Sequence, residues 1–426
     1  MQTKPTVHAP RFTIAVVADT QNYASYRNQR EAGFPFNARE ILWDMMHYIA
    51  RNAVKHGGEI AFATGLGDMW EHQLSFDVDA EHAARGDKSV ANPLLEAFMP
   101  PSPEQVVNVE IPAVREAWKI LDGVLPFCVI PGNHDHDHMW TDANYPPSEG
   151  ASFAELTVAK VGSVHCGGLT NWKANFGAHT PIFRNKPWYV ASFREGANSA
   201  QIFTGATHRF LHLGLEMSPD ARVIAWAESV IAAFPGVPTI VSIHEFLNGK
   251  GEREPLECFD LSRLDPERHT PAKLWDRFVA RHDQILCVLN GHFHGVRHRV
   301  DENQHGHQVM QFLSNYQSRK QSVRGTSPLT PVIDGIGDGW IRLMEFDLQT
   351  EHPTLRLRAY STYFKAFASD LPDYATWYRA EHPDMPADEF RALDDFTLPL
   401  VDFHQRFARA RIDHDDVNDA TLARQA

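Results

Sequence analysis

Cysteine is scarce in this chain, and Cys-x-x-Cys pairs are absent. Four cysteines stand among 426 residues. A disulfide framework of the kind that holds small secreted domains together is therefore not expected. Cys128 and Cys287 lie inside apolar runs and are expected to be small buried side chains.

Long apolar runs are also missing. No stretch approaches the roughly 20 apolar residues of a membrane-spanning helix, so no membrane span is expected. Residues Met1 to Arg11 lack the apolar segment of a secretory signal, which indicates a cytoplasmic protein. A secreted or periplasmic protein whose signal has been removed would have the same sequence.

Positive charge is in deficit, and histidine is abundant. The formal net charge is -14, and a surface with that excess repels polyanions. Bulk nucleic-acid binding is disfavoured, whereas a small-molecule substrate fits. The hydrophobic fraction of 43% is near the globular average and supports a sizeable core. The 24 histidines are the unusual feature, because imidazole is the commonest metal ligand among side chains.

Strand and helix patterns alternate through the first two thirds of the chain. Continuous apolar, β-branched runs predict buried strands at 12–18, 60–63, 127–130, 210–215, 239–243 and 285–289. Helical spacing predicts helices from an Asn37 cap to Gly57-Gly58, around 114–121, at 221–233, and from a Thr270-Pro271 start to about residue 282. This alternation is typical of a layered α/β domain.

The pattern changes after Gly291 and is interrupted in three places. Short runs at 308–313, 340–346 and 354–360 predict a late antiparallel sheet. The acidic segment from Phe367 onward is expected to be a helical or irregular tail. Long insertions at about 71–112, 136–208 and 246–269 leave from the strand ends that carry the polar motifs. Loops of this length are usually lids or binding loops.

Polar, metal-capable residues follow five of the predicted strands. The clusters are Asp19-Thr20-Gln21, Gly67-Asp68, Gly132-Asn133-His134-Asp135, His244, and Gly291-His292-Phe293-His294. Open α/β sheets place their ligands at the carboxyl ends of the strands, so these clusters are expected to meet in one cleft. Each motif is weak when taken alone. All of them in this order, each at a strand end, favour a common site.

The residue types suit phosphate-ester hydrolysis. A phosphate ester is anionic and resists attack by another anion. Two cations about 3.5–4 Å apart neutralise its oxygens and lower the pKa of a bridging water, which becomes the nucleophile. A carboxylate can bridge two metals, and imidazole suits Zn, Fe and Mn-type ions. We therefore expect two divalent or mixed-valence metal ions of these elements.

Together the motifs resemble the calcineurin-like metallophosphoesterases. The resemblance covers roughly Arg11 to Tyr363 and implies a four-layer αββα sandwich of two mixed sheets, with 364–426 as a C-terminal extension. It implies that Asp68 bridges the metals and that His134 protonates the leaving group, oriented by Asp135. The remaining implied ligands are Asp19, Gln21 and His294 at one metal, and Asn133, His244 and His292 at the other.

Gln21 departs from the commonest family pattern, which has histidine at that position. Some members carry glutamine there, followed by an aromatic residue such as Tyr23, and the stretches 315–317 and 339–346 also resemble that subgroup. Glutamine is a neutral and harder ligand than imidazole. Either its metal is held more weakly, or Gln21 only hydrogen-bonds a bound water.

The sequence does not identify the substrate. Phosphate mono- and diesters both fit, and the same centre acting on another kind of substrate, or a non-catalytic scaffold, are the alternatives. A monoester needs cationic groups for its extra charge. The insertions offer Arg184, Arg194 and Arg253.

Other residues in the insertions have two possible roles each. His72, His136 and His138 are either cleft residues or ordinary loop residues. Aromatic residues in the insertions either stack on a substrate or anchor their loops by packing. They are Trp70, Trp140, Tyr145, Trp172 and Trp188.

Overall fold

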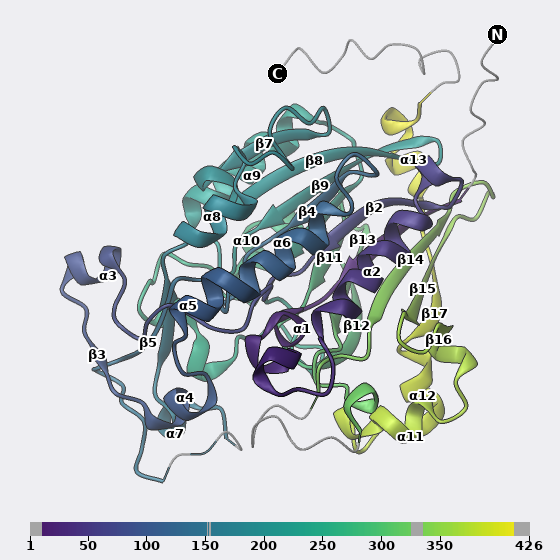
Figure 1. The fold of residues 1–426 in the computed structure, drawn as a ribbon. Coiled ribbons are helices and arrows are strands. Elements are labelled where there is room, and N and C mark those ends of the chain that lie inside the picture. The colour runs from purple at the N-terminus through teal and green to yellow at the C-terminus, as the bar shows by residue number, and fades with distance from the viewer. Residues whose placement is uncertain (1–10, 151, 153–154, 325–334, 413–426) are drawn as a thin grey trace.

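The computed structural model of the protein describes residues 11–150, 152, 155–324 and 335–412. It is a mixed α/β fold with two seven-stranded sheets and a small three-stranded sheet. Figure 1 shows helices lying along both sides of the strands. The expected α/β class is therefore confirmed.

The first large sheet combines early and late strands. Its order is β16-β15-β14-β1-β2-β4, and β17 also pairs with β15. The early strands β1, β2 and β4 are parallel, whereas β14 runs antiparallel to β1. The bounds are β1 Arg11–Val17, β2 Ile60–Gly65, β4 Phe127–Val129, β14 Trp340–Asp347, β15 Thr354–Ser361, β16 Ala366–Phe367 and β17 Asp395–Pro399.

The second large sheet has the order β12-β13-β11-β10-β9-β8-β7. Its central strands β9, β10, β11 and β13 are parallel, and antiparallel strands lie at both edges. The bounds are β7 Tyr189–Phe193, β8 Asn198–Gly205, β9 His208–Leu215, β10 Thr239–Ile243, β11 Ile285–Asn290, β12 Gly295–Glu302 and β13 Gln308–Asn315.

The helices vary from single turns to the 13 residues of α2 and of α9. The longest elements pack on the two large sheets, and the shorter ones belong to the insertions and the C-terminal segment. The bounds are α1 Gln21–Ala24, α2 Arg39–Arg51, α3 Ala80–Arg85, α4 Pro93–Phe98, α5 Pro103–Gln105, α6 Ile111–Lys119, α7 Val158–Val161, α8 Thr170–Phe176, α9 Ala221–Ala233, α10 Pro271–Arg277, α11 Tyr374–Tyr378, α12 Ala387–Ala392 and α13 Phe403–Arg406.

Alternate side chains of β1 face two different cores. Ile14 and Val16 belong to a cluster that also contains Phe210 of β9, so this core contains residues of both large sheets. Ala15 and Val17 face the cluster that holds Leu42 of α2, together with side chains of α6. A strand needs apolar residues on both faces when both faces are covered, which explains the continuous run in the sequence. A third cluster joins the second sheet to α9 and α10.

The expected helix and strand positions hold, with differences at the ends. Thr270 caps α10 as expected, through its Oγ1 and the Lys273 N–H. The capping role expected for Asn37 is wrong, because its Oδ1 accepts from the Arg30 N–H and Ala38 precedes the first turn of α2. α2 ends at Arg51, and Gly57 instead closes a short 3₁₀ turn in a left-handed conformation.

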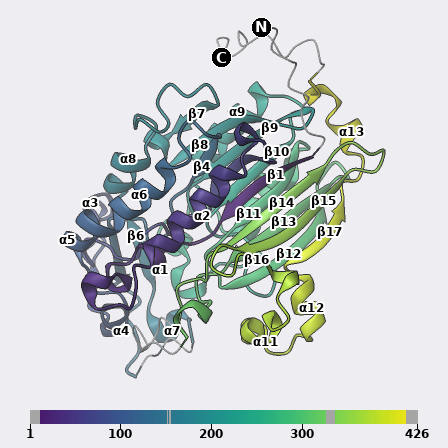
Figure 2. The ribbon, with the colours of Figure 1, turned by 45° about the vertical axis from the view of Figure 1, so that its right-hand side comes forward.

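The late strands do not form a sheet of their own. β13 pairs parallel with β11 in the second sheet, while β14 and β15 extend the first sheet beside β1. Figure 2 shows β14 and β15, which pair with each other, with α11 and α12 at one end of them. The sequence indicated strand character correctly. The pairing partners could not be predicted from local patterns, because strand pairing is a tertiary contact and, for example, joins Arg11 of β1 to Asp347 of β14.

The segment from Phe367 onward is more than a helical or irregular tail. Within its described part, β17 pairs with β15, and Leu400, Phe403 and Phe407 enter the core that contains residues of both sheets. Residues 413–426 lie outside the described residues. Within the described parts of the chain, no helix has the length and apolar character that crossing a bilayer requires.

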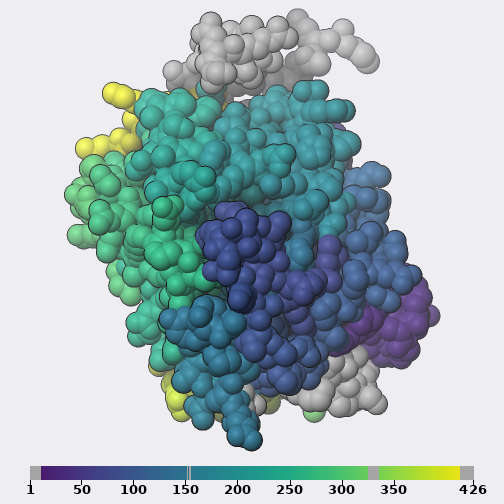
Figure 3. All heavy atoms as spheres, turned by 90° about the vertical axis from the view of Figure 1, so that its left-hand side faces the viewer, coloured from purple at the N-terminus to yellow at the C-terminus, as the bar shows by residue number. Residues whose placement is uncertain are grey.

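The insertions contain structure of their own. The first two supply the small sheet, β3 Ser89–Val90, β5 His138–Asp142 and β6 Val164–Gly167. The second also supplies β7, at the edge of the second large sheet, and its neighbour β8, neither of which was predicted from the sequence. Residues of the first insertion, in dark blue, occupy the middle of the face in Figure 3, bordered by later segments in teal and green.

Candidate metal centre

The expected site residues follow strands of both large sheets. Asp19, Asp68 and Asn133 follow β1, β2 and β4, while His244 and His292 follow β10 and β11. Each of these strands pairs with a parallel neighbour from the same set: β1 with β2, β2 with β4, and β10 with β11. Their carboxyl ends therefore face the same way in each sheet, and the five side chains gather at one end of the molecule.

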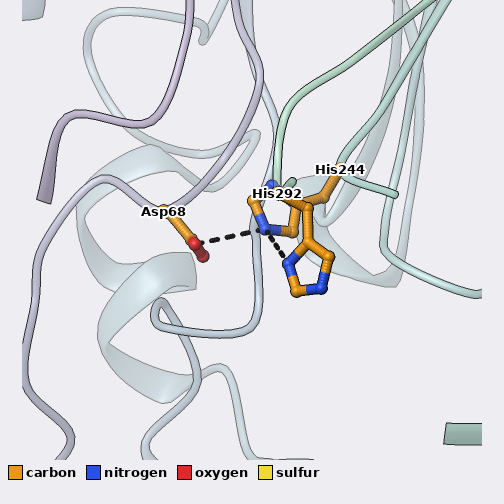
Figure 4. Close-up of side chains that lie close together, drawn as sticks. All are labelled: Asp68, His244 and His292. Carbon is orange, nitrogen blue, oxygen red and sulfur yellow. Dashed lines mark hydrogen bonds and ion pairs between the residues drawn. The ribbon is translucent and has the colours of Figure 1, made fainter. Parts of the chain in front are cut away.

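The closest group is Asp68, His244 and His292, shown in Figure 4. His244 Nε2 lies 3.2 Å from Asp68 Oδ2 and 3.2 Å from His292 Nδ1. The same nitrogen lies 3.1 Å from the side-chain oxygen of Asn133. His244 is fully buried, and Asp68 and Asn133 are nearly so. The site thus holds a carboxylate, an amide and two imidazoles within ligand distance of a common point.

The hydrogen bonding of His244 leaves one nitrogen among competing acceptors. Its Nδ1 lies 2.7 Å from the Leu66 carbonyl oxygen, so Nδ1 carries a proton and donates it. Nε2 then faces Asp68 Oδ2, Asn133 Oδ1 and His292 Nδ1 together. A single proton satisfies only one such contact. A cation accepts lone pairs from all four atoms, so this donor set fits a metal ion.

Backbone strain is concentrated at two of these residues. Asp68 has φ 51° and His292 has φ 68°, a left-handed conformation that costs energy for residues other than glycine. Such strain persists only where surrounding contacts enforce it. The neighbouring glycines are required as well. A Cβ on Gly132 would lie 2.2 Å from Asp68 Oδ1, and one on Gly291 would lie 2.1 Å from Asp19 Oδ1.

Asp19 forms a second part of the site with its own contacts. Its carboxylate accepts hydrogen bonds from the Asn315 side-chain amide at 2.6 Å and from the His292 backbone N–H. Gln21 donates from Nε2 to Asp68 Oδ2 at 3.4 Å, and its buried Oε1 has no hydrogen-bond partner among the described residues. An orphaned buried carbonyl beside two carboxylates fits a metal or a bound water.

His294 lines the same cavity but does not belong to the close group. Its Nε2 lies 2.8 Å from Gln317 Nε2, so the glutamine amide donates to the ring in this arrangement. Asn315 and Gln317 were not expected as site residues. They belong to the stretch that resembles the glutamine-containing subgroup, and that likeness was the signal that could have identified them.

Burial and neighbouring charged groups shift the pKa values of the site residues. Burial, with Asp68 adding to it, raises the pKa of Asp19 to about 7. Burial would also raise the pKa of Asp68, but His244 and His134 reverse this and hold it well below its usual range. Burial and repulsion from His244 lower the pKa of His292 to about 3. Burial and neighbouring charges thus shift the pKa values of Asp19 and Asp68 in opposite directions.

His134 faces the cavity from beside Asp68. Its Nδ1 lies 2.8 Å from the Glu71 carbonyl oxygen and donates to it. Its backbone N–H donates to Asp68 Oδ1 at 2.9 Å, and its Nε2 lies 3.9 Å from Asp68 Oδ2. Burial lowers the pKa of His134, but Asp68 and Glu71 outweigh this and raise it. The ring is therefore held at the cavity wall with Nε2 available.

The resemblance implies that Asp135 orients His134, and in the structure the hydrogen bonds of Asp135 go to backbone groups. Asp135 accepts the Met69 N–H at 2.8 Å and the Gly132 N–H at 2.7 Å. It therefore ties the loop after β2 to the loop after β4. Because Asp135 is fully buried, backbone N–H groups rather than water satisfy its carboxylate. Burial also raises the pKa of Asp135 to about 8. Asp135 is thus linked to His134 through the backbone of both loops.

Glu110 supports His134 from a distance and was missed by the sequence analysis. This fully buried carboxylate accepts from the backbone N–H groups of Glu71 and His72 and pairs with His72 Nδ1 at 2.7 Å. It thereby fixes the segment whose carbonyl receives the His134 proton. Nothing near Glu110 in the sequence resembles a motif, so only the fold could reveal this contact.

Most of the other residues under consideration have structural roles. His72 is fully buried against Glu110, and His136 is buried with its Nδ1 near the Gly132 carbonyl. Trp70, Trp140 and Trp172 are fully buried, and Trp188 packs on the core beside α6. None of Trp70, Trp140, Tyr145, Trp172 and Trp188 is among the described residues that line the site cavity. The packing explanation is therefore confirmed for the buried tryptophans.

A second group of potential ligands joins the three insertions. It consists of His82, His165 and Asp265, one from each. Asp265 also pairs with Arg85 at 2.6 Å and with Arg268 at 3.1 Å. Two guanidinium groups already balance this carboxylate, so the group is best described as an ion-pair network. A metal ion here would have to compete with both arginines.

Comparisons with known proteins add little. No protein-family model matches the chain. The chain is 24% identical over 300 residues to the uncharacterized protein YvnB of Bacillus subtilis (strain 168). The alignment covers 69% of this chain and 18% of that protein, so the chain spans less than a fifth of its length. The relative's description names no activity. The likeness therefore does not point to a function.

Proposed function

We propose that this protein is a dinuclear metal-dependent hydrolase of phosphate esters, of the calcineurin-like type. The observation that carries the proposal is the position of His244 Nε2, which lies among Asp68 Oδ2, Asn133 Oδ1 and His292 Nδ1. Such a set is stabilised by a cation and poorly by one proton. The layers seen in the fold support the finer proposal of a four-layer αββα sandwich, with helices outside two facing sheets.

The ligands divide into two sets in this proposal. Asp68 would serve both sets. Asn133, His244 and His292 would hold one ion, and Asp19, Gln21 and His294 would hold the other. When bound, two such ions neutralise phosphoryl oxygens and lower the pKa of a water molecule. Mn, Fe and Zn all accept this mixture of carboxylate, amide and imidazole ligands.

The remaining residues hold the ligand side chains and the surrounding loops in position. Asn315 fixes the Asp19 carboxylate through a 2.6 Å hydrogen bond. His134 holds a proton on Nδ1 against the Glu71 carbonyl, which turns Nε2 toward the cavity. From there Nε2 can deliver a proton to a departing oxygen. Asp135 and Glu110 hold the loops that carry these groups and touch no substrate.

The test combines metal content with activity. Purified protein is loaded with Mn, Fe or Zn, its metal stoichiometry is measured, and it is assayed against aryl phosphate mono- and diesters. We expect about two ions per chain and metal-dependent ester cleavage. Binding without cleavage of any phosphate ester would favour the alternative of another substrate. Absence of tight metal binding would favour a non-catalytic scaffold.

A further inference from the structure

A cavity of about 490 Å³ opens directly over the candidate metal centre. One end is polar and contains Asp68, Asn133, His134, His292 and Gln317. This size is within the range of small-molecule sites, which are about 300–1,000 Å³. The cavity is therefore large enough for a phosphoryl group and a substantial substituent on it.

The other end of the cavity is apolar, and all three insertions build it. The first contributes Leu95 and Met99, the second Met139 and Val164, and the third Leu256 and Phe259. The same side chains form one packed cluster, to which Phe98 adds from the end of α4. Three separate insertions thus converge to make an apolar wall beside a charged centre. An apolar wall of this kind favours binding of an apolar substrate group, because removing apolar surface from water is favourable.

Lysine and arginine are missing from the described lining of the same cavity. The undescribed positions 151, 153, 154 and 325–334 contain no lysine or arginine in the sequence either. A second negative charge on the phosphoryl group would therefore have no guanidinium or ammonium to meet it.

The arginines expected to supply that charge are engaged elsewhere. Arg194 pairs with Glu216 at 2.6 Å and also contacts Asp220. Arg253 pairs with Asp301 and packs on the Trp275 ring. Arg184 is exposed. None of the three is among the described lining residues of the site cavity, so the expectation that they meet a monoester is not supported.

We infer that the substrate is a phosphodiester carrying an apolar alkyl or aryl substituent, which the insertion wall buries. This inference rests on the proposed function. A diester carries one negative charge near neutral pH, whereas a monoester carries about 1.5 to 2. The diester therefore places less uncompensated charge beside the apolar wall. The diester also has a second substituent, which can pack against the apolar wall while the leaving group faces His134.

The test uses a series that changes only the apolar group. Metal-loaded protein is assayed with methyl, butyl and octyl 4-nitrophenyl phosphate, and with the monoester 4-nitrophenyl phosphate. The leaving group is constant, so differences report binding of the alkyl chain. We expect kcat/KM to rise about threefold to fourfold for each added methylene until the cavity is full. We expect the monoester to be cleaved more slowly than every diester.

Variants locate the effect on the wall. Leu256→Ser should flatten the dependence of kcat/KM on chain length, because it lowers the value for the octyl diester more than the value for the methyl diester. Val107→Ala is the matched control, because Val107 is 47% exposed and lies in the first insertion away from the cavity lining. Thermal melting checks that each variant folds. Dibutyl and dimethyl phosphate, titrated calorimetrically, give a binding readout that does not depend on turnover, and the dibutyl ester should bind more tightly.

The outcomes separate this inference from the proposed function. Metal-dependent cleavage with no dependence on chain length, or with the monoester preferred, overturns the inference and leaves the hydrolase proposal standing. Failure of the loaded protein to cleave either series overturns both. An aryl substituent in place of the octyl chain, at equal apolar area, shows which kind of group the wall prefers.

Discussion

The Nε2 atom of His82 lies 3.2 Å from Oδ2 of Asp265, which joins the first insertion to the third. His165 of the second insertion lies 3.5 Å from the same oxygen, and Asp79 holds the other nitrogen of His82 at 2.6 Å. Figure 3 views the side of the molecule on which the first insertion meets its neighbours. This network holds in place the segments that also build the cavity wall.

The network predicts a pH dependence of stability. Burial lowers the pKa of His82, but Asp265 and Asp79 outweigh it and raise the pKa to about 9, while the pKa of Asp79 falls to about 2. A raised histidine pKa stabilises the fold fully below about 6.5, the unfolded value, and the effect is lost as the pH rises to about 9. The lowered aspartate pKa stabilises above about 3.8 and the effect is lost toward pH 2.

Urea unfolding of the metal-free protein between pH 6 and 9 measures this effect. Stability should fall across that range, and His82→Gln should remove the part of the slope that this network contributes, because Asp19 and Asp135 with raised pKa values also titrate there. Arg85, Arg268 and His165 also face the network, so the same titration on Arg85→Gln separates their contribution. A slope unchanged by His82→Gln would show that the decline comes from other groups.

Asp68→Asn should disturb both metals at once. The carboxylate lies 3.2 Å from His244 Nε2 and also receives the Gln21 and His134 hydrogen bonds, so an amide changes every part of the site. Asp370→Asn, at an exposed position, is the control. Elemental analysis should show loss at both sites in the first variant alone. Full stoichiometric metal in Asp68→Asn would rule out the bridging role.

Gly132→Ala should weaken metal binding although no ligand is removed. The new Cβ would lie 2.2 Å from Asp68 Oδ1, so the carboxylate must move. Gly249→Ala is the matched control, because its Cβ would have no neighbour closer than 3.9 Å. Competition with a chelator should show a loss of about 10-fold to 100-fold for Gly132→Ala only. Equal affinity in both variants would mean that Asp68 is not a ligand.

Gln21→His should affect one metal only. The Gln21 carbonyl is buried without a partner among the described residues, and imidazole is a softer ligand at that place. Titration of metal-free protein with Mn and with Zn should show one binding constant changed by about 10-fold to 100-fold. Two unchanged constants would indicate that Gln21 only orders a water.

His134→Ala should retain both metals and lose turnover selectively. A general acid contributes about 10²–10⁴-fold when the leaving group needs a proton. Alkyl esters should therefore suffer far more than nitrophenyl esters, and the dependence of rate on leaving-group pKa should steepen. Equal losses across the series would assign His134 to stabilisation of phosphoryl charge. Loss of metal would make it a ligand.

The sequence by itself determined the local elements and the order of the site residues. An apolar run such as that in β1 predicts a buried strand wherever its partners lie. Motif residues such as Asp68 and His292 could be placed at strand ends for the same reason, because periodicity and neighbouring residues are local properties. The gathering of His244, Asn133 and Asp68 around one point agrees with that expectation.

Only the tertiary structure decided the pairings that join distant parts of the chain. β14 lies beside β1, Glu110 holds the loop behind His134, and Arg194 pairs with Glu216 away from the cavity. Each contact depends on which surfaces meet when the sheets and insertions pack. The spacing of residues along the sequence does not predict these partners. Which side chains meet depends on burial and charge balance in the folded protein. The apolar wall over the metal centre arises in the same way.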